Sequence, residues 1–438
     1  MGRNRTELRQ LLQLAWPVVL GQIGQVLMGV EDLIMVGDLG AGALAAVGMG
    51  NLWSFGVLVL GFGALRGADP LFSQAYGARD DARAALWLGR AVLLAVMLTV
   101  PIMAAHLLAA PGLAALEQPA EAIPAAAGYA CAVMWGTAPM LLFNVLSQHL
   151  QARNQVLLPT LVILGGNVLN VLLNGLFLHV LEWGVVGVGW STAIGRLASM
   201  VALFALCADG LRRLPAPSVG DVFSLAGGAR LLRLGAPIGV QYGLEVWAFN
   251  ATGLMVGWLG TAALAAHQIA LNISALAFMM PFGLSIAASV RVGNRLGAGE
   301  DWTRSAATAI IAASAWMGIC ALGLWLAAPA LTRAYTDDAG VIEIAVLLLP
   351  IAAAFQLFDG IQAVCAGVLR GVGDTRSPAI VNLIGFWGIG LPVGYLLGVH
   401  ANSPPGVWYG LIVGLGVVSA LLLARVRGLA RGGVSALA

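Results

Sequence analysis

Two stretches of this chain, one in each half, carry the same pattern. Residues 11–46 read LLQLAWPVVLGQIGQVLMGVEDLIMVGDLGAGALAA, and residues 231–266 read LLRLGAPIGVQYGLEVWAFNATGLMVGWLGTAALAA. Laid on each other without a gap, at an offset of 220 (231 − 11 = 220), they are identical at 14 of 36 positions. A match of this length indicates an internal repeat, and Pro17 and Pro237 occupy the same place in it.

Each copy of the repeat opens a series of long apolar segments. The chain has 438 residues, of which 60% are hydrophobic and 10% are charged, whereas an average soluble domain has about 25% charged residues. Recurrent apolar runs of about 20 residues or more predict an all-α protein that spans a membrane many times. The expected spans lie at residues 9–37, 44–72, 86–110, 122–146, 156–180, 184–208, 231–258, 262–288, 304–330, 341–368, 378–400 and 405–426.

The distribution of charge predicts the orientation of these spans. All 22 basic residues are Arg, and with twelve spans most of them fall at the termini or in the loops that follow even-numbered spans, as Arg79 and Arg153 do. Acidic residues such as Glu117 and Glu182 lie in the opposite loops. Because basic residues collect on the cytoplasmic side, we expect both termini to be cytoplasmic.

A polar interval divides the spans into two sets of six. We therefore expect an N-lobe at residues 1–208, a cytoplasmic linker at residues 209–230, and a C-lobe with a short cytoplasmic tail at residues 231–438. Since each set has an even number of spans, both lobes insert in the same orientation, which is a parallel repeat. Substrate sites of transporters built in this way lie between the halves, although a duplication retained only for folding is the alternative.

Four acidic residues lie inside apolar segments: Glu31, Asp32, Glu245 and Asp359. A carboxylate in hydrocarbon costs about 2.5–3.5 kcal/mol and marks an ion, proton or substrate path. The alternative, an acid that only hydrogen-bonds between helices, is favoured for Glu31, because neighbouring helical residues point about 100° apart. The other acids have no basic residue at their depth except Arg196, so they must be protonated, bind a cation or face water.

Polar residues of the fifth and sixth spans could complete a cation site. Asn170 and Asn174 are four residues apart, so they share one face of a helix. With Asp32 and the hydroxyl of Thr192 they would supply oxygen ligands for a hard monovalent cation. Asn residues also commonly hydrogen-bond between membrane helices without binding any ion, and the spacing leaves both interpretations open.

Aromatic and Met residues of the second half are expected mainly to pack against neighbouring helices. A subset could line an apolar cavity that accepts varied ligands, because Met-rich surfaces repack easily. The candidate cavity residues are Trp247, Phe249, Met279, Phe282, Phe355 and Gln268.

Several function classes are excluded by what the sequence lacks. There is no phosphate-binding loop with its Lys, so the chain is not an ATP-driven pump by itself. No Ser/His/Asp or His/Glu/His set indicates an enzyme, no basic run indicates nucleic acid as a partner, and no cofactor is expected. The Cys residues lack metal-ligand spacing and are expected to be buried thiols.

Five further motifs give the chain a family resemblance. They are Val-Glu-Asp-Leu-Ile-Met-Val-Gly at 30–37, Gln-Ala-Tyr-Gly-Ala at 74–78, Ala-Ala-His-Gln-Ile-Ala-Leu-Asn at 265–272, Arg-Val-Gly-Asn-Arg-Leu-Gly at 291–297, and Gly-Val-Leu-Arg-Gly-Val-Gly-Asp-Thr-Arg at 367–376. With the repeat, they make the chain resemble the NorM-like branch of the multidrug and toxic compound extrusion (MATE) family over nearly its whole length.

The resemblance implies a fold and a function. The fold would be a V-shaped arrangement of two pseudo-symmetric six-helix bundles. The function would be secondary active export of cationic, amphipathic drugs in exchange for H⁺ or Na⁺ by alternating access. The protein would be a monomer in the bacterial cytoplasmic (inner) membrane. A flippase for lipid-linked precursors, another metabolite exporter of the same superfamily, and a membrane transferase are the alternatives.

The resemblance also assigns residues to two cation sites. Asp32, Asn170, Asn174 and Thr192 fall on the polar positions of an N-lobe site, and Glu245 and Asp359 fall on the acids of a C-lobe site. Either set is a possible Na⁺ site. Some relatives have Asp where this chain has Asn174, and some have Tyr where it has Phe355, so this chain lacks one carboxylate and one hydroxyl. The choice between H⁺ and Na⁺ stays open.

Overall fold

The computed structural model describes residues 2–437, which are almost entirely helical and contain no strand. The helices of the first half are α1 (Gly2–Val36), α2 (Ala41–Leu65), α3 (Ala68–Gly77), α4 (Asp81–Leu107), α5 (Ala109–Ala115), α6 (Ile123–Val133), α7 (Thr137–Ala152), α8 (Leu157–Gly175) and α9 (Gly184–Arg212). Those of the second half are α10 (Val219–Val222), α11 (Leu225–Gly257), α12 (Thr261–Gly297), α13 (Thr303–Tyr335), α14 (Ala339–Val372), α15 (Arg376–Asn382), α16 (Leu391–Gly394) and α17 (Pro404–Gly432).

These helices agree with the predicted set of twelve spans. The second span is made of α2 and α3, and the fourth is made of α6 and α7 with a 3₁₀ turn at Met134–Gly136 between them. Eleven of the described helical segments are long and apolar enough to cross a membrane. The remaining span is α11, in which Gln241, Glu245 and Asn250 dilute the apolar sequence.

Contacts divide the chain into two compact units. Unit 2 is Leu20–Gly239, and unit 1 is the chain up to Val19 together with everything from Val240 onward. Both divisions fall inside a helix, α1 in one case and α11 in the other, and Val19 and Gly239 are partners in the repeat (239 − 19 = 220). The units thus differ from the predicted division at residues 208 and 231, because each unit includes the first part of the helix that continues in the other.

Small residues allow these exchanged helix segments to pack closely within each unit. In unit 2, α11 crosses α2 so closely that a Cβ added to Gly235 would lie 1.8 Å from the carbonyl oxygen of Ala64. In unit 1, α1 crosses α12, where a Cβ on Gly283 would lie 2.9 Å from the carbonyl oxygen of Ala15. Glycine permits backbones to approach in this way in membrane helices. Ala15 and Gly235 are repeat partners, so the crossing itself is repeated (235 − 15 = 220).

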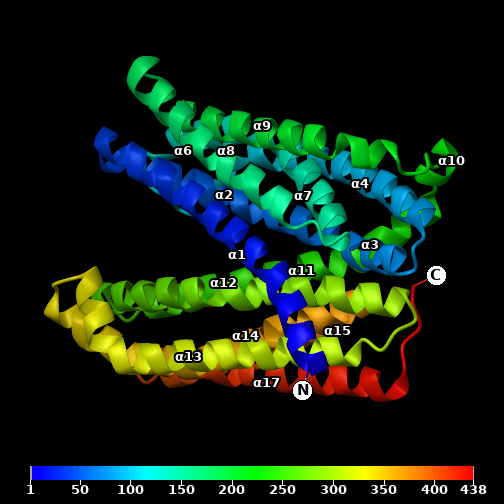
Figure 1. Ribbon diagram of the computed structural model, residues 1–438. Coiled ribbons are helices and arrows are strands. Elements are labelled where there is room, and N and C mark those ends of the chain that lie inside the picture. Colours follow the sequence, from blue (N-terminus) through cyan, green and yellow to red (C-terminus); the bar gives the residue numbers. More distant parts are fainter. Residues whose placement is uncertain (1, 438) are drawn as a thin grey trace. The chain divides into compact units, whose positions relative to one another are not determined.

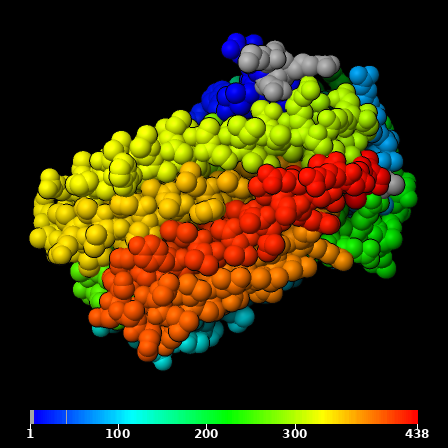
Figure 2. Space-filling model, turned by 90° about the horizontal axis from the view of Figure 1, so that it is seen from below, coloured from blue at the N-terminus to red at the C-terminus, as the bar shows by residue number. Residues whose placement is uncertain are grey.

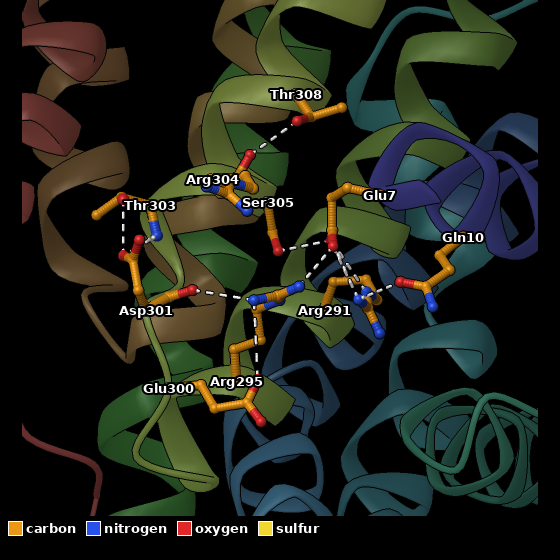
Figure 3. Close-up of polar contacts among 10 residues, drawn as sticks. All are labelled: Glu7, Gln10, Arg291, Arg295, Glu300, Asp301, Thr303, Arg304, Ser305 and Thr308. Carbon is orange, nitrogen blue, oxygen red and sulfur yellow. Dashed lines mark hydrogen bonds and ion pairs between the residues drawn. The ribbon is translucent and has the colours of Figure 1, made fainter. Parts of the chain in front are cut away.

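An ion cluster fixes the first part of α1 within unit 1 (Figure 3). Glu7 is buried, and its carboxylate accepts hydrogen bonds from Arg291, from Arg295 at 2.6 Å and from the Ser305 hydroxyl at 2.7 Å. Arg291 also donates to the side-chain oxygen of Gln10 at 2.6 Å. Charge-assisted bonds of this kind are about twice as strong as neutral ones, so they hold α1 against α12 and α13.

The rest of each unit is a helical bundle. In unit 1, α14 is the central helix and packs against α12, α13 and α17. Figure 2 shows α17 (red) lying along residues 376–399 (orange) on the surface of this unit. In unit 2, α9 packs against α6, α7 and α8, and these helices run side by side in Figure 1. The site described next lies where α8 and α9 meet the second part of α1.

Candidate functional site

Asp32 is the centre of a buried polar network in unit 2. It lies on α1, and only 1% of its surface is exposed. The side-chain amide of Asn174 on α8 donates to Oδ1 of Asp32 at 2.7 Å, and the Thr192 hydroxyl on α9 donates to Oδ2 at 3.1 Å. Each carboxylate oxygen therefore has its own donor, and three helices meet at one acid.

Two more side chains close the network. The Asn174 amide lies 3.1 Å from the side-chain oxygen of Asn170, and the Asn170 amide donates to the Ser191 hydroxyl at 3.3 Å. The Ser191 hydroxyl donates in turn to the side-chain oxygen of Asn174. The structure therefore brings together the four residues predicted for this site, Asp32, Asn170, Asn174 and Thr192. Ser191 was not predicted, and its only signal in the sequence is its position next to Thr192.

Asn167 has a different role from the other two Asn residues of α8. Its amide donates to the backbone carbonyl of Gly24 on α1 at 2.6 Å, so it joins the two helices directly. Asn167 therefore forms the kind of hydrogen bond between helices that the spacing of Asn170 and Asn174 left open for those two residues. Glu31 stands outside the Asp32 network, and its Oε2 atom is buried without a hydrogen-bond partner.

Two charged or polar side chains border the network without forming an ion pair with Asp32. Arg196 on α9 is close enough to attract Asp32 and Tyr129 electrostatically. Tyr129 on α6 is completely buried and interacts with both Asp32 and Thr192. Arg196, the basic residue that the sequence placed at the depth of the acids, is therefore a neighbouring charge and forms no ion pair with Asp32.

The predicted acids of the second half form a pair within unit 1. Glu245 on α11 and Asp359 on α14 are close enough for like-charge repulsion. Gln362 donates from its amide to Oε1 of Glu245 at 2.7 Å. Gln362 lies three residues after Asp359, so both face the same side of α14. Its spacing could have identified it from the sequence. Arg370, two turns further along α14, attracts Glu245 from a distance.

The candidate cavity residues of unit 1 differ in exposure, and two of them are in contact. Phe355 is almost fully buried, and its ring contacts the rings of Phe249 and Trp408 at centroid distances of 6.0 and 5.8 Å. Trp247 and Gln268 are exposed, and Phe249, Met279 and Phe282 are partly buried. Their role in substrate binding stays a prediction.

A cavity of about 660 Å³ lies within unit 2 and contains none of these residues. Side chains of α4, α7 and α9 and the segment at residues 214–217 line it, and they are mainly apolar.

The prediction of buried thiols holds for Cys207 and Cys365 but not for Cys131 and Cys320, which are partly exposed. Within residues 2–437, no group of three His, Cys, Asp or Glu side chains could hold a metal ion.

Comparisons with known proteins agree with the internal repeat. The MatE family model matches the chain twice, at residues 17–176 and 237–396, and both ends of the two matches differ by the repeat offset (237 − 17 = 220 and 396 − 176 = 220). A similar protein from Bradyrhizobium diazoefficiens, named "Probable multidrug resistance protein NorM", is 32% identical over 97% of this chain and 94% of its own length.

Another relative and a solved structure support the same family and fold. The "Multidrug resistance protein MdtK" of Edwardsiella ictaluri is 33% identical over 98% of this chain and 97% of its own length. The crystal structure of the eukaryotic MATE transporter AtDTX14 is similar with a TM-score of 0.89, at 20% identity and with 98% of both chains covered. At this identity the structural likeness concerns the fold alone.

Proposed function

The chain belongs to the MatE family, and we propose that it is a secondary active transporter that exports cationic, amphipathic drugs in exchange for H⁺ or Na⁺. The names of its relatives as multidrug resistance proteins support this substrate class. The main support for ion-coupled transport is Asp32, a buried acid in a chain that spans the membrane many times. Such an acid marks an ion or proton path.

The Asp32 network is suited to binding and releasing a cation or a proton. In its charged form the carboxylate is stabilised by donors from Asn174 and Thr192. The Thr192 hydroxyl also lies 3.1 Å from the carbonyl oxygen of Val188, so it has a second acceptor when Oδ2 is occupied. A cation or proton can then bind Asp32 without leaving the hydroxyl unpaired, which would otherwise cost about 1–3 kcal/mol.

The energy available from one coupling charge is sufficient for drug export. One monovalent cation that moves inward across 100 mV supplies about 2.3 kcal/mol, which corresponds to a drug gradient of roughly 50-fold. Cation binding at Asp32 or at the Glu245–Asp359 pair would favour either the inward-facing or the outward-facing conformation of the transporter. Drug binding would favour the other conformation. Trp247, Phe249, Met279, Phe282, Phe355 and Gln268 stay the candidate substrate residues.

The proposed setting is the bacterial cytoplasmic (inner) membrane, with a monomer whose two termini are cytoplasmic. The proposed lobes follow residues 1–208 and 231–438, with residues 209–230 as a cytoplasmic linker. Within this last segment the structure has the end of α9, the short helix α10 and the start of α11. Basic residues on this side of the predicted spans support the orientation, and no catalytic step is part of the proposed function.

The test is drug transport in proteoliposomes that contain the full-length protein. Accumulation of ethidium is measured with a pH gradient or a Na⁺ gradient imposed separately. We expect at least one gradient to drive transport in the wild-type protein and Asp32→Asn to remove the response. Absence of ethidium movement under both gradients, with protein that is correctly folded and inserted, would overturn the proposal.

A further inference from the structure

The cavity of unit 2 and the segment beside it have no part in the proposed transport. The cavity has a volume of about 660 Å³, which lies within the range of about 300–1,000 Å³ that is usual for ligand sites. Its walls come from α4, α7, α9 and residues 214–217, which connect α9 to α10. All of these belong to unit 2, so the site is complete within one unit.

The cavity is as long as one leaflet of a bilayer is deep. Along α9 it extends from Met200 to Arg212 (212 − 200 = 12 residues), a helical rise of about 18 Å. One leaflet contributes about 15 Å to a hydrocarbon core of about 30 Å. Phe204, between the two ends, lines the cavity and is also exposed, so the cavity opens to the surface of the unit.

The wall of the cavity changes from apolar to charged at one end. Among the residues that the structure describes, Arg212 is the one charged side chain on this wall, and it ends α9. It lies 3.8 Å from Asp209, and both side chains are mostly exposed, so this pair contributes little and Arg212 can contact another anion. Pro215 and Pro217 add no backbone N–H group to the wall. The site therefore fits a long apolar chain with a negative group at one end.

The segment that follows the cavity wall is held against α4. Arg90 donates to the backbone carbonyl of Asp221 from Nε at 3.0 Å and from Nη2 at 2.9 Å. A Cβ added to Gly89 would lie 3.0 Å from a methyl group of Val222, so α10 packs directly on α4. The Ser218 hydroxyl caps α10 by accepting from the backbone N–H of Asp221 at 3.1 Å. These contacts fix which side chains of the segment point outward.

Three of the outward-pointing side chains are large and apolar. Val219, Phe223 and Leu225 are 73%, 64% and 90% exposed. They lie between the end of α9 and the predicted span at residues 231–258, and Figure 1 shows α10 at the end of unit 2 where α9 ends. Apolar side chains at this level of a membrane protein are buried about 5–10 Å deep, at the boundary between headgroups and acyl chains.

We propose that the cavity, Arg212 and the face formed by Val219, Phe223 and Leu225 bind an anionic phospholipid. One acyl chain occupies the cavity, the phosphate contacts Arg212, and the apolar face enters the same leaflet. In the proposed orientation this is the cytoplasmic leaflet. The proposal goes beyond drug transport and does not depend on which ion is coupled to it.

The charge of Arg212 predicts a preference among lipids. One Arg near a membrane surface strengthens the binding of anionic lipid by about fivefold. Phosphatidylglycerol has a net negative charge, whereas phosphatidylcholine with the same acyl chains has none. We therefore expect the first molecule of phosphatidylglycerol to bind about fivefold more tightly than the first molecule of phosphatidylcholine, with a smaller ratio at high salt.

The experiment measures the binding of each lipid to the purified full-length protein by native mass spectrometry. Arg212→Gln should remove the preference for phosphatidylglycerol, while Arg212→Lys, which keeps the charge, should retain it. The matched control is Arg304→Gln, an exposed Arg at the start of α13 in unit 1, which should also retain the preference. Leu146→Trp fills the cavity and should weaken both lipids by a similar factor.

Four results would contradict the lipid site. They are equal affinity of the wild-type protein for both lipids, an unchanged preference in Arg212→Gln, an unchanged affinity in folded Leu146→Trp, and competition by glycerol phosphate, which has the charge without the chains. A dimer that Leu225→Ser dissociates would assign the apolar face to a second copy of the chain instead. Since Arg212 is exposed, its variants decide the outcome even if Leu146→Trp does not fold. Ethidium transport is scored separately, so the two proposals can fail independently.

Discussion

The two units differ in the groups that surround their acids. Unit 2 surrounds Asp32 with an amide donor, a hydroxyl donor and the nearby charge of Arg196. Unit 1 places Glu245 and Asp359 beside each other, and Gln362 supplies the amide donor. One arrangement stabilises a charged carboxylate, whereas the other penalises the second of two charges.

The repeat explains why the scaffolds match although the acids do not. When the two copies of the repeat are laid on each other, Asp32 corresponds to Thr252, and Glu245 corresponds to Gln25. Thr252 donates its hydroxyl to the backbone of its own helix, at the carbonyl oxygen of Ala248. The helix crossing is thus retained in both halves, while the polar side chains placed on it have diverged.

The largest effect on stability is expected at the helix crossing that is repeated within each unit. Gly235→Ala in unit 2 would place a methyl group against the backbone of Ala64, which cannot move aside, and should cost about 3 kcal/mol or more. Gly283→Ala in unit 1 should cost less, because its backbone obstacle, the carbonyl oxygen of Ala15, lies 2.9 Å away and its nearest obstacle is a side-chain atom of Val19. Thermal unfolding in detergent measures both changes.

The control for this prediction is Gly165→Ala on α8. Nothing lies within 4 Å of the added Cβ, so the substitution should be neutral or stabilise the helix by up to about 1 kcal/mol. Equal unfolding temperatures for Gly235→Ala and Gly165→Ala would contradict the close crossing of α11 and α2.

The next effect concerns the ion cluster, which unit 1 has and unit 2 lacks. The repeat counterpart of Glu7 is Gly227, which lies against the guanidinium of Arg90 (227 − 7 = 220). Glu7→Ala removes the shared acceptor of Arg291 and Arg295 and should lower the free energy of unfolding by about 2–3 kcal/mol.

Glu300→Ala is the matched control, because Glu300 is mostly exposed and lies 3.7 Å from Arg295. Exposed pairs contribute about 0–1 kcal/mol, so this variant should unfold close to the wild-type temperature. If both variants unfolded at the same temperature, the cluster would not anchor α1.

A third prediction tests which unit carries the coupling charge. Asp32→Asn keeps the shape of the side chain but cannot ionise, so the drug gradient should fall by roughly 50-fold at 100 mV, the contribution of one charge. Glu31→Gln, next to it and outside the network, should retain a gradient within about twofold of wild type. The gradient is measured as ethidium accumulation in proteoliposomes.

The roles of the two units would be reversed by one pattern of results. This is a large loss of gradient in Glu245→Gln together with a normal gradient in Asp32→Asn. In that case unit 2 would hold a structural network, and the paired acids of unit 1 would carry the coupling.

The smallest expected effect is a gain in stability rather than a loss. Glu245→Gln relieves the repulsion with Asp359 while it retains an oxygen that can accept from Gln362. We expect the free energy of unfolding to rise by up to about 1 kcal/mol, and the melting temperature to rise by a few degrees at most. Asp32→Asn should lower it, since it weakens two hydrogen bonds to a charged group.

Much of the Asp32 site could be predicted from the sequence, because its signals are local. Asn170 and Asn174 are one helical turn apart, and Asp32 stands out in an apolar run. Ser191 could not be recognised, since its contact with Asn174 depends on how α8 and α9 pack. The cavity role predicted for Phe355 stays a prediction, because aromatic composition does not distinguish a cavity lining from a core and its ring contacts those of Phe249 and Trp408.

The sequence by itself determined the twelve spans, the repeat and the cost of its buried acids, because hydropathy and charge are properties of the residues alone. Only the tertiary structure decided that α1 and α11 are each shared between two units, since no local pattern records which distant helix a backbone crosses. It also decided that Arg196 neighbours Asp32 without pairing with it. Gly136 leaves room for the Arg196 side chain, and no local pattern in the sequence records that contact between distant residues.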